Sequence, residues 1–350
     1  AGLAAAAAVT ARDARLRVVV LEASDRVGGR IETGRRFGFP MDLGATWIAH
    51  GDGNPLYSFV KQHGLETESV PWRKYLVYMN GTLLTERELK IGDAAYSKLV
   101  QLMGGDATAT GPAITLGGDF RTQLLQAPES HKLYLEYMLQ SHLARDSAAE
   151  LEGMSLRGTL MNDGADCEAK EPWTGDEGDH LILRGFGQVL DLLKQGASLE
   201  RRLVGAGLPP FDIRTGWRVQ SIAQNASAVA ITSEQGWLLT AKYVVVTVSM
   251  GVLQSGNLRF EPLLSPQKAR AISRSAMGAL DKVFLKFKSL PLSLNRVPGL
   301  LDASASIDRK VGEFHNLEAF SLWQPVLLGL AHGDTARRLE AMDDAAVVAE

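Results

Sequence analysis

The hydrophobic pattern of the chain starts with a short apolar run without polar alternation, Val18–Leu21. Such a run predicts a fully buried strand of a parallel sheet. The small residues of Gly2–Ala8, just upstream, predict a helix that lies close against that sheet. Glu22 ends the run, so its carboxylate is expected at the C-terminal edge of the strand, where open α/β sheets bind their ligands.

Similar signals recur later in the chain. Tyr243–Val248 is a second apolar run that predicts a buried strand, and Lys282–Phe287 predicts another strand. Turn residues divide Trp217–Thr240 into a predicted β-meander. Leu181–Leu183 predicts a short strand, and Gln188–Lys194 predicts the helix that follows it.

The middle of the sequence has a helical period instead. Apolar residues recur at amphipathic spacing across Glu86–Leu151, which predicts a helical insertion between pieces of the α/β domain. A shorter helix is expected to begin at Pro55, with Asn54 as its cap. The acidic segment 163–179 predicts an irregular loop.

Composition narrows the class of protein. A chain of 350 residues with 45% hydrophobic and 22% charged residues is typical of a globular protein with two domains. The net charge of −3 gives no argument for binding nucleic acid, and no apolar segment is long enough to cross a bilayer. The single cysteine, Cys167, excludes an internal disulfide and a multi-cysteine metal site. No metal is expected, and the cytoplasm, a reducing compartment, is the expected location.

The most informative spacing is the twenty residues from Gly2 to Glu22. It is the spacing from the last glycine of a dinucleotide-binding G-x-G-x-x-G motif to its ribose-binding acid. The turn Gly28-Gly29-Arg30 then supplies a guanidinium that can bind a phosphate through two hydrogen bonds. The motif's first strand and first two glycines would precede residue 1, so the sequence is expected to be part of a longer protein.

Five segments in order resemble the flavin-containing amine oxidase family, particularly its polyamine-oxidase-like members. They are GLAAA…VVVLEASDRVGGRI, DLGATWIAHGDGNPLY, GDHLILRGFGQVLDLL, YVVVTVSMGVLQSGNLRFEPLLSPQKARAI with GALDKVFLKF after it, and PVLLGLAHGDTARRLEAMDDAAVVAE. The resemblance implies a two-domain α/β fold, in which a Rossmann-like FAD-binding domain is interleaved with an α+β substrate domain. The expected boundaries assign residues 1–80 and 181–258 to the FAD-binding domain, and residues 81–180 and 259–350 to the substrate domain.

The resemblance also implies the chemistry. The cofactor would be FAD, whose N5 takes a hydride from the carbon next to an amine nitrogen. The imine formed would hydrolyse to an aldehyde, and dioxygen would reoxidise the flavin with release of hydrogen peroxide. The expected partners are therefore a small-molecule amine and dioxygen. The amine has to be unprotonated, because an ammonium has no lone pair to support the forming iminium.

The family pattern assigns cofactor contacts to residues in several segments. Glu22 would accept hydrogen bonds from the adenosine ribose, Arg30 would lie near the pyrophosphate, Arg26 near the adenosine, and the backbone of Val219 against adenine. The full set of expected cofactor-binding residues is Gly2, Glu22, Ala23, Arg26, Gly28, Gly29, Arg30, Leu43, Gly44, Ala45, Thr46, Trp47, Val219 and Thr247.

Two residues are candidates for catalysis. Strand alternation alone places Lys282 on a largely polar face, as an ordinary exposed lysine, together with Phe284, Lys286 and Lys288. The resemblance instead implies that Lys282 holds a water against the flavin N5. It also implies that His50 contacts substrate, although Ala49 is an insertion in the family's usual tryptophan-isoleucine-histidine-glycine run.

Two further departures and several alternatives bear on the function. Ser249 stands where the family usually has proline, and the family's closing segment with a glycine-glutamate pair is absent from these 350 residues, which alone are expected to bind FAD poorly. The GDGNP loop and the modest helical insertion favour an amine or polyamine substrate over a histone tail. An L-amino-acid oxidase, for which no carboxylate-binding cation is evident, and a non-catalytic flavin-binding scaffold are the alternatives.

Overall fold

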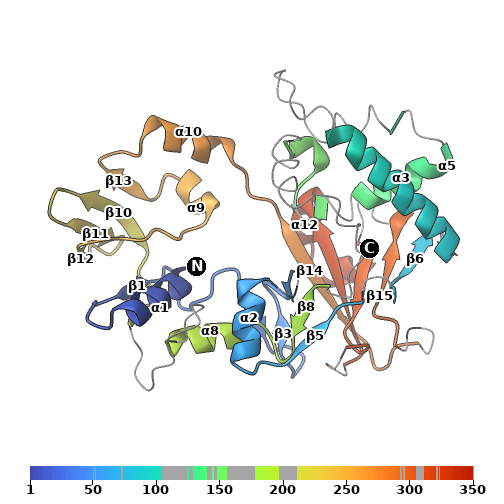
Figure 1. Ribbon diagram of the computed structural model, residues 1–350, viewed down its shortest axis with the longest axis horizontal. Helices are drawn as coiled ribbons and strands as arrows, with labels where there is room; N and C mark the ends of the chain where they lie inside the picture. Colours follow the sequence, from blue (N-terminus) through green and yellow to red (C-terminus); the bar gives the residue numbers. More distant parts are fainter. Residues whose placement is uncertain are drawn as a thin grey trace. The chain divides into compact units, whose positions relative to one another are not determined.

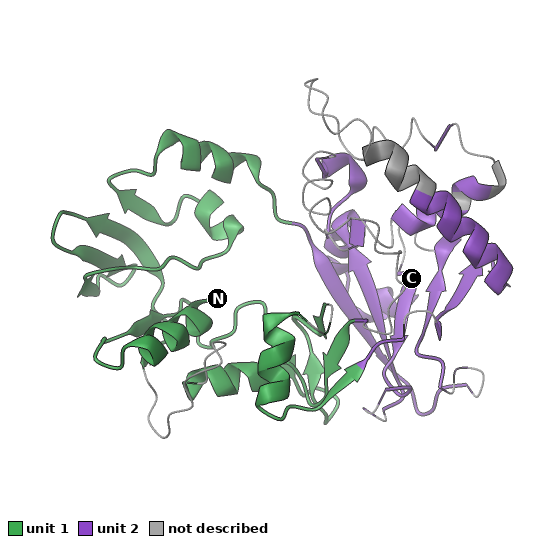
Figure 2. Ribbon diagram, in the orientation of Figure 1, with its two compact units in different colours: residues 1–68, 179–277 green, residues 69–178, 278–350 purple. Residues whose placement is uncertain are grey.

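The computed structural model describes residues 1–49, 51, 53–71, 74–104, 124–125, 129–139, 144–145, 148–155, 178–196, 211–291, 294, 296–304, 311–320, 322 and 324–349. The chain divides into two compact units, and each unit is built from two separate stretches of sequence (Figure 2). Unit 1 comprises residues 1–68 and 179–277, and unit 2 comprises residues 69–178 and 278–350.

Unit 1 begins with the predicted helix and strand. Helix α1 (Gly2–Arg12) buries Ala6 and Ala7, and β1 (Val19–Leu21) pairs in parallel with β9 (Asp212–Arg214). The parallel pairing of β1 is confirmed, but its expected full burial is wrong, because all three of its residues are only half-buried. Within the described residues this sheet has two strands, so one edge of β1 has no strand beside it.

The core of unit 1 lies around three helices. Helix α2 (Pro55–Gln62) begins as predicted, with the Asn54 side chain accepting a hydrogen bond from the Leu56 N–H, and α8 (Gly187–Lys194) follows the predicted turn. Buried side chains of α1, α2 and α8 form one cluster with Ile48 and Phe211. Small sheets complete this part: β2 (Thr33–Gly34) with β3 (Met41–Asp42), and β4 (Trp47–Ile48), β8 (His180–Ile182) and β5 (Thr67–Ser69) in the order β4-β8-β5.

The predicted β-meander is confirmed. Strands β10 (Val219–Gln224), β11 (Val229–Ser233) and β12 (Leu238–Ala241) pair antiparallel in sequence order, and β13 (Arg259–Glu261) adds in parallel to β10 (Figure 1). Helices α9 (Met250–Gln254) and α10 (Pro266–Arg274) flank β13 in the sequence.

The prediction of a buried strand at Tyr243–Val248 is wrong. The segment belongs to no sheet, and its side chains are exposed, with 79% of Tyr243 and 68% of Val245 accessible. An apolar run becomes a buried strand only where neighbouring backbone pairs with it and other side chains cover it. No strand among the described residues pairs with this segment.

Unit 2 is built on a six-stranded sheet in the order β14-β17-β16-β15-β6-β7. Its strands are β6 (Leu76–Met79), β7 (Thr82–Leu83), β14 (Leu280–Lys286), β15 (Gly299–Asp302), β16 (Glu313–Asn316) and β17 (Val326–His332). Among the described strands of this sheet, only β15 and β6 pair in parallel. Six of the seven residues of β17 are buried, so this strand lies at the centre of the unit's core.

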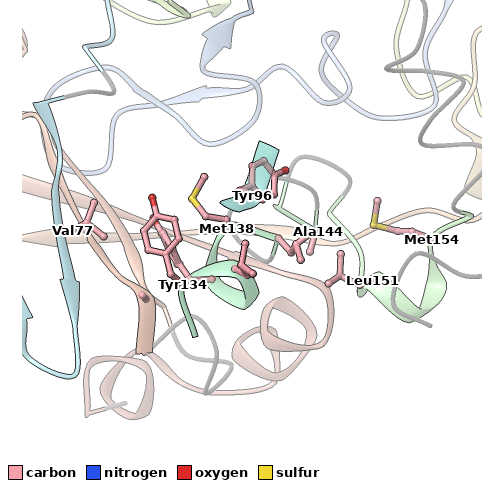
Figure 3. Packing of buried hydrophobic residues seen from close by; sticks show 11 residues of the cluster. Val77, Tyr96, Tyr134, Met138, Ala144, Leu151 and Met154 are labelled. Atoms are coloured by element: carbon pink, nitrogen blue, oxygen red, sulfur yellow. The ribbon is translucent and has the colours of Figure 1, made fainter. Parts of the chain in front are cut away.

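Helices pack against this sheet. Helices α3 (Glu86–Gly104) and α5 (Glu129–Met138), with the 3-10 turn Leu151–Gly153, match the predicted helical insertion where it is described. Figure 3 shows Tyr134 and Met138 of α5 in a buried cluster with Val77 of β6. A second cluster joins α12 (Gly333–Glu340) to β17 and β14 through Ala331 and Val283, and α13 (Asp344–Ala349) follows α12. Nearly all of the predicted acidic loop at 163–179 lies outside the described residues.

Two of the expected domain boundaries differ from the divisions in the structure. Residues 69–80 belong to unit 2, because β6 pairs with β15 of its sheet. Residues 259–277 belong to unit 1, because β13 pairs with β10. In both cases the strand pairs with one that is not its neighbour in the sequence, and this pairing has no signal near the boundary itself.

Candidate cofactor-binding and active-site residues

Glu22 lies at the C-terminal end of β1, where the sequence predicts a ribose-binding carboxylate. Its backbone N–H donates to the carbonyl of Arg214, so the residue continues the pairing of β1 with β9. Its Oε1 accepts hydrogen bonds from the backbone N–H and the hydroxyl of Ser24, both at 2.9 Å. No described residue hydrogen-bonds to Oε2. The side chain is therefore fixed through one oxygen, and the other is available to a ligand.

The loop after Glu22 needs glycine at two positions for different reasons. Gly28 has φ +123°, and a Cβ there would lie 2.5 Å from the carbonyl oxygen of Ile31 and 2.7 Å from Leu190 Cδ1. Gly29 has φ +58°, but nothing lies within 4 Å of its Cβ position. The first glycine thus permits tight internal packing, and the second leaves its backbone open to close approach.

The two arginines of this loop differ. Arg26 folds back on the loop: its guanidinium donates to the carbonyls of Gly29 and Ile31 and pairs with Glu32. Arg30 is exposed, and its side chain has no hydrogen-bond or ion-pair partner among the described residues. Arg26 therefore holds the shape of the loop, while Arg30 retains a guanidinium that can bind an anion.

The segment Leu43–Trp47 runs beside this loop. The N–H of Leu43 donates to the carbonyl of Glu32 at 2.8 Å, and that of Ala45 donates to Arg30 at 3.0 Å. At Gly44 a Cβ would collide with the Arg30 carbonyl, so only glycine allows this approach. The structure thus brings two sequence-predicted groups together, Gly28–Arg30 and Leu43–Ala45. Thr46 is buried and Trp47 is half-buried at the start of β4.

The remaining predicted contacts also lie in unit 1. A Cβ on Gly2, the first residue of α1, would lie 3.0 Å from the Thr247 hydroxyl, so these two positions are neighbours. Val219 is the first residue of β10, shortly after Trp217, whose N–H donates to the Glu22 carbonyl at 2.8 Å. Ala23 is exposed beside Glu22.

The backbone N–H groups of the turn before α8 already donate hydrogen bonds to side chains of unit 1. Both carboxylate oxygens of Asp42 accept from the Phe186 N–H, at 2.9 and 3.0 Å, and the Thr33 hydroxyl accepts from the Gly187 N–H at 2.9 Å. A carboxylate at a helix N-terminus stabilises the helix through its dipole. This turn therefore serves the fold, unlike the loop at Gly28–Arg30.

These residues fit a dinucleotide. A carboxylate with one open oxygen at a strand end suits ribose hydroxyls. An open glycine backbone followed by an unpaired guanidinium suits a pyrophosphate. Among the described residues, no group of three histidine, cysteine, aspartate or glutamate side chains is arranged to hold a metal ion.

Lys282 lies in β14 of unit 2 and is half-buried, not the exposed lysine that strand alternation alone suggests. The preceding residue, Asp281, points to the α12 face. Burial raises the pKa of the Asp281 carboxyl, and so does the adjacent carboxylate of Glu340 in α12. Adjacent strand residues point to opposite faces, so Lys282 lies on the face away from α12. His50, the other catalytic candidate, lies outside the described residues.

Sequence reasoning missed a buried polar cluster in unit 2. Arg145 Nη1 lies 2.7 Å from both carboxylate oxygens of Glu313, and His315 Nε2 lies 3.0 Å from Glu313 Oε1. His315 Nδ1 is 2.7 Å from the hydroxyl of Tyr75. Glu313, His315 and Tyr75 are each at most 5% exposed. The alternation of Glu313 and His315 on one strand face was the available signal, but nothing in the sequence marks that face as buried.

The charges in this cluster determine the pKa values of its groups. Burial by itself raises the pKa of Glu313, but the positive Arg145 and the contact with His315 outweigh it and lower the pKa to about 2. Burial, and then the Glu313 charge, raises the pKa of Tyr75 well above its usual value. At neutral pH the cluster therefore holds a carboxylate paired with a guanidinium, and a neutral tyrosine that is hydrogen-bonded to His315.

Comparison with known proteins decides the family. The sequence profile described as "Flavin containing amine oxidoreductase" matches residues 1–350. The chain belongs to this family. The cofactor of this flavin-containing amine oxidoreductase is FAD, and its fold is that of the flavin amine oxidases, an FAD-binding domain interleaved with a substrate domain. The family's enzymes are oxidoreductases that act on CH–NH groups.

Individual relatives agree with the family match. The chain is 28% identical to polyamine oxidase 2 of Arabidopsis thaliana over 97% of its length, and 30% identical to polyamine oxidase 3 of Oryza sativa subsp. japonica over 83%. It spans 67% and 58% of the lengths of those two relatives. Wild-type putrescine oxidase, solved with putrescine, matches 99% of this flavoprotein chain, which covers 77% of that structure, with a TM-score of 0.73 at 17% identity. The described residues include no helix that is both long and apolar enough to cross a membrane.

Proposed function

We propose that this flavoprotein oxidises a polyamine or a related amine and releases hydrogen peroxide. The observation that carries the proposal is the match to polyamine oxidases over 97% of the chain, together with the family match over residues 1–350. The single cysteine is compatible with a cytoplasmic location, which we include in the proposal.

In this proposal the residues of unit 1 bind the cofactor. Glu22 Oε2 accepts hydrogen bonds from ribose hydroxyls, and the Arg30 guanidinium binds the pyrophosphate. The open backbone at Gly29 lets a phosphate approach, while Arg26 and Gly28 keep the loop in shape. Gly2, Leu43–Trp47, Val219 and Thr247 line the same cofactor, as the family pattern implies.

FAD, when bound, supplies the electrophilic N5 that accepts a hydride from the carbon next to the amine nitrogen. The part of Lys282 is to hold a water through Nζ and to supply positive charge where negative charge develops. His50 contacts the substrate amine in the family pattern. An apolar surrounding favours the neutral amine, which is the form that can be oxidised.

The test uses the full-length protein, loaded with FAD, without oxygen. Spermine, spermidine, acetylated polyamines, aromatic monoamines and L-amino acids are added separately, and the absorbance of oxidised flavin is followed. We expect polyamines to bleach it, with recovery and hydrogen peroxide when air is admitted. Bleaching by L-amino acids alone would identify an amino-acid oxidase, and a yellow protein that none of these compounds bleaches would be a scaffold.

A substitution isolates the role of Lys282. In Lys282→Met we expect the flavin to be reduced or reoxidised at least about tenfold more slowly, because loss of one preorganised charged group commonly costs that much or more. The FAD content should be unchanged, since Lys282 lies outside unit 1. Lys286→Met, on the same strand and exposed, is the control. Turnover equal to that of the unmodified protein would remove the lysine from the mechanism.

A further inference from the structure

Residues 144–145 and 148–150, the Arg145–Glu150 turn, contact three separate elements of unit 2. Arg145 pairs with Glu313 of β16, the Ala148 carbonyl accepts from the Ala279 N–H at 2.7 Å, and Glu150 Oε1 accepts from the Asp334 N–H at 2.9 Å. Ala279 directly precedes β14, and Asp334 is at the N-terminus of α12. One short turn therefore joins the sheet, the start of β14 and the start of α12.

The described residues of the turn fit closely against one another and against Gly333. The Ala148 N–H donates to the Arg145 carbonyl at 2.8 Å, and Ala148 has φ +52°, which a residue with a Cβ adopts only at a cost. Gly333 has φ +57°, and a Cβ there would lie 2.3 Å from Glu150 Oε1. The Gly333 N–H also donates to the Ala279 carbonyl at 2.9 Å. Both backbone groups of Ala279 are thus held, one by the turn and one by Gly333.

The strand that this turn holds is the one that carries Lys282. Among the described residues β14 pairs only with β17, so it is an edge strand, and edge strands lack the second ladder that would fix their ends. Lys282 is three residues from Ala279. The register places Lys282 opposite Leu330, and Leu330 opposite Glu313, so the Arg145–Glu313 pair lies on the same face of the sheet as Lys282.

We infer that the Arg145–Glu150 turn, through its described residues 144–145 and 148–150, positions Lys282, with Arg145 and Glu150 as positioning residues. The inference rests on the proposed function for its catalytic meaning, but the placement of Lys282 can be tested separately. Arg145 fixes the turn to the centre of the sheet. Glu150 fixes it to Gly333–Asp334, and this contact keeps Ala279 and the start of β14 in place.

The test compares Glu150→Ala, which removes the acceptor, with Glu150→Gln, which keeps an acceptor oxygen and loses the charge. In Glu150→Ala the Asp334 amide loses its acceptor. Because the turn then holds Gly333 and Ala279 less firmly, we expect the amide protons of Ala279 and Gly333 to exchange about tenfold faster. Glu150→Gln should restore slow exchange. The amide of Leu285, at the far end of β14, should exchange at an unchanged rate and serves as the internal control.

A second readout addresses the lysine directly. Lysines are labelled by reductive ¹³C-methylation, and the signal of Lys282 is assigned by its loss in Lys282→Arg. In Glu150→Ala the ¹³C chemical shift of the Lys282 signal should change, because the surroundings of the side chain change, while that of Lys286 should stay the same. Faster exchange at Ala279 with an unmoved Lys282 signal would overturn the inference and leave a merely structural turn.

The third measurement is the steady-state kinetics of the Glu150 variants. In the FAD-loaded protein Glu150→Ala should lower kcat several-fold with little change in KM, and Glu150→Gln should recover most of it. If Lys282→Met turns over normally while the Lys282 signal still moves in Glu150→Ala, the proposed role of the lysine fails and its positioning stands. If neither signal nor kcat moves, the positioning fails and the proposed function is untouched.

Discussion

The loop that follows β1 in unit 1 and the cluster around Glu313 in unit 2 are specified in different ways. The loop is shaped by backbone conformation: Gly28 and Gly29 have positive φ, and the polar side chains around them stay accessible. The cluster is shaped by side-chain charge buried in a sheet, where Arg145 and His315 surround one carboxylate. The loop keeps groups open for a ligand, whereas the cluster places its charged and polar groups against one another.

The difference predicts how each region fails. A buried charge without its partner has a large free-energy cost, because nothing replaces the lost water. An exposed loop loses only local geometry, which costs less in stability but acts directly on ligand binding. Substitutions in the Glu313 cluster should therefore destabilise unit 2, whereas substitutions in the loop should mainly weaken ligand binding by unit 1.

The largest effect is expected for Arg145→Met. It leaves the Glu313 carboxylate buried without its guanidinium, which should lower the free energy of unfolding by about 3–5 kcal/mol in urea denaturation. The double variant Arg145→Met with Glu313→Leu removes both charges and should be more stable than the single variant. A single variant as stable as the unmodified protein would show that the pair contributes no more than an exposed ion pair.

Acid should act on the same carboxylate. The folded-state pKa of Glu313 is lowered to about 2, below its usual value, so its stabilising contribution is fully present above the unfolded-state pKa. That contribution is lost as the pH falls from about 5 through about 2, and it amounts to on the order of 3 kcal/mol. Unfolding free energies measured across this range should fall less in Glu313→Gln. Parallel curves for the two proteins would contradict the lowered pKa.

The features that the sequence predicts are those that nearby residues determine. Glu22, Gly28 and Gly29 were predicted because spacing and residue type within thirty positions determine a strand end and a turn. The Asn54 cap and the β-meander were predicted for the same reason, since local hydrogen bonds and turns decide them.

The features that the sequence did not predict all depend on tertiary contacts between distant parts of the chain. Tyr243–Val248 has the composition of a buried strand, but no described strand covers it. Arg145, Glu313 and Tyr75 come from distant parts of the chain, and each resembles a surface or amphipathic residue in its own segment. The expected domain boundaries differ from the two compact units for a similar reason, because β6 and β13 each pair with a strand that is not their neighbour in the sequence, β15 and β10 respectively. Burial that depends on distant partners has no local signature.

The smallest stability effect, and the most direct test of the loop, comes from its two glycines. Gly28→Ala combines a positive φ with a Cβ 2.5 Å from the Ile31 carbonyl, so it should cost about 2 kcal/mol of unfolding free energy and weaken FAD binding. Gly29→Ala meets no atom within 4 Å and should cost only about 1 kcal/mol, from its left-handed backbone. Its methyl group nevertheless occupies the open side of the backbone, so FAD titration should show weaker binding there as well. If Gly29→Ala binds FAD as tightly as the unmodified protein, the ligand does not approach this backbone. The loop would then have a structural role, as the Glu313 cluster has.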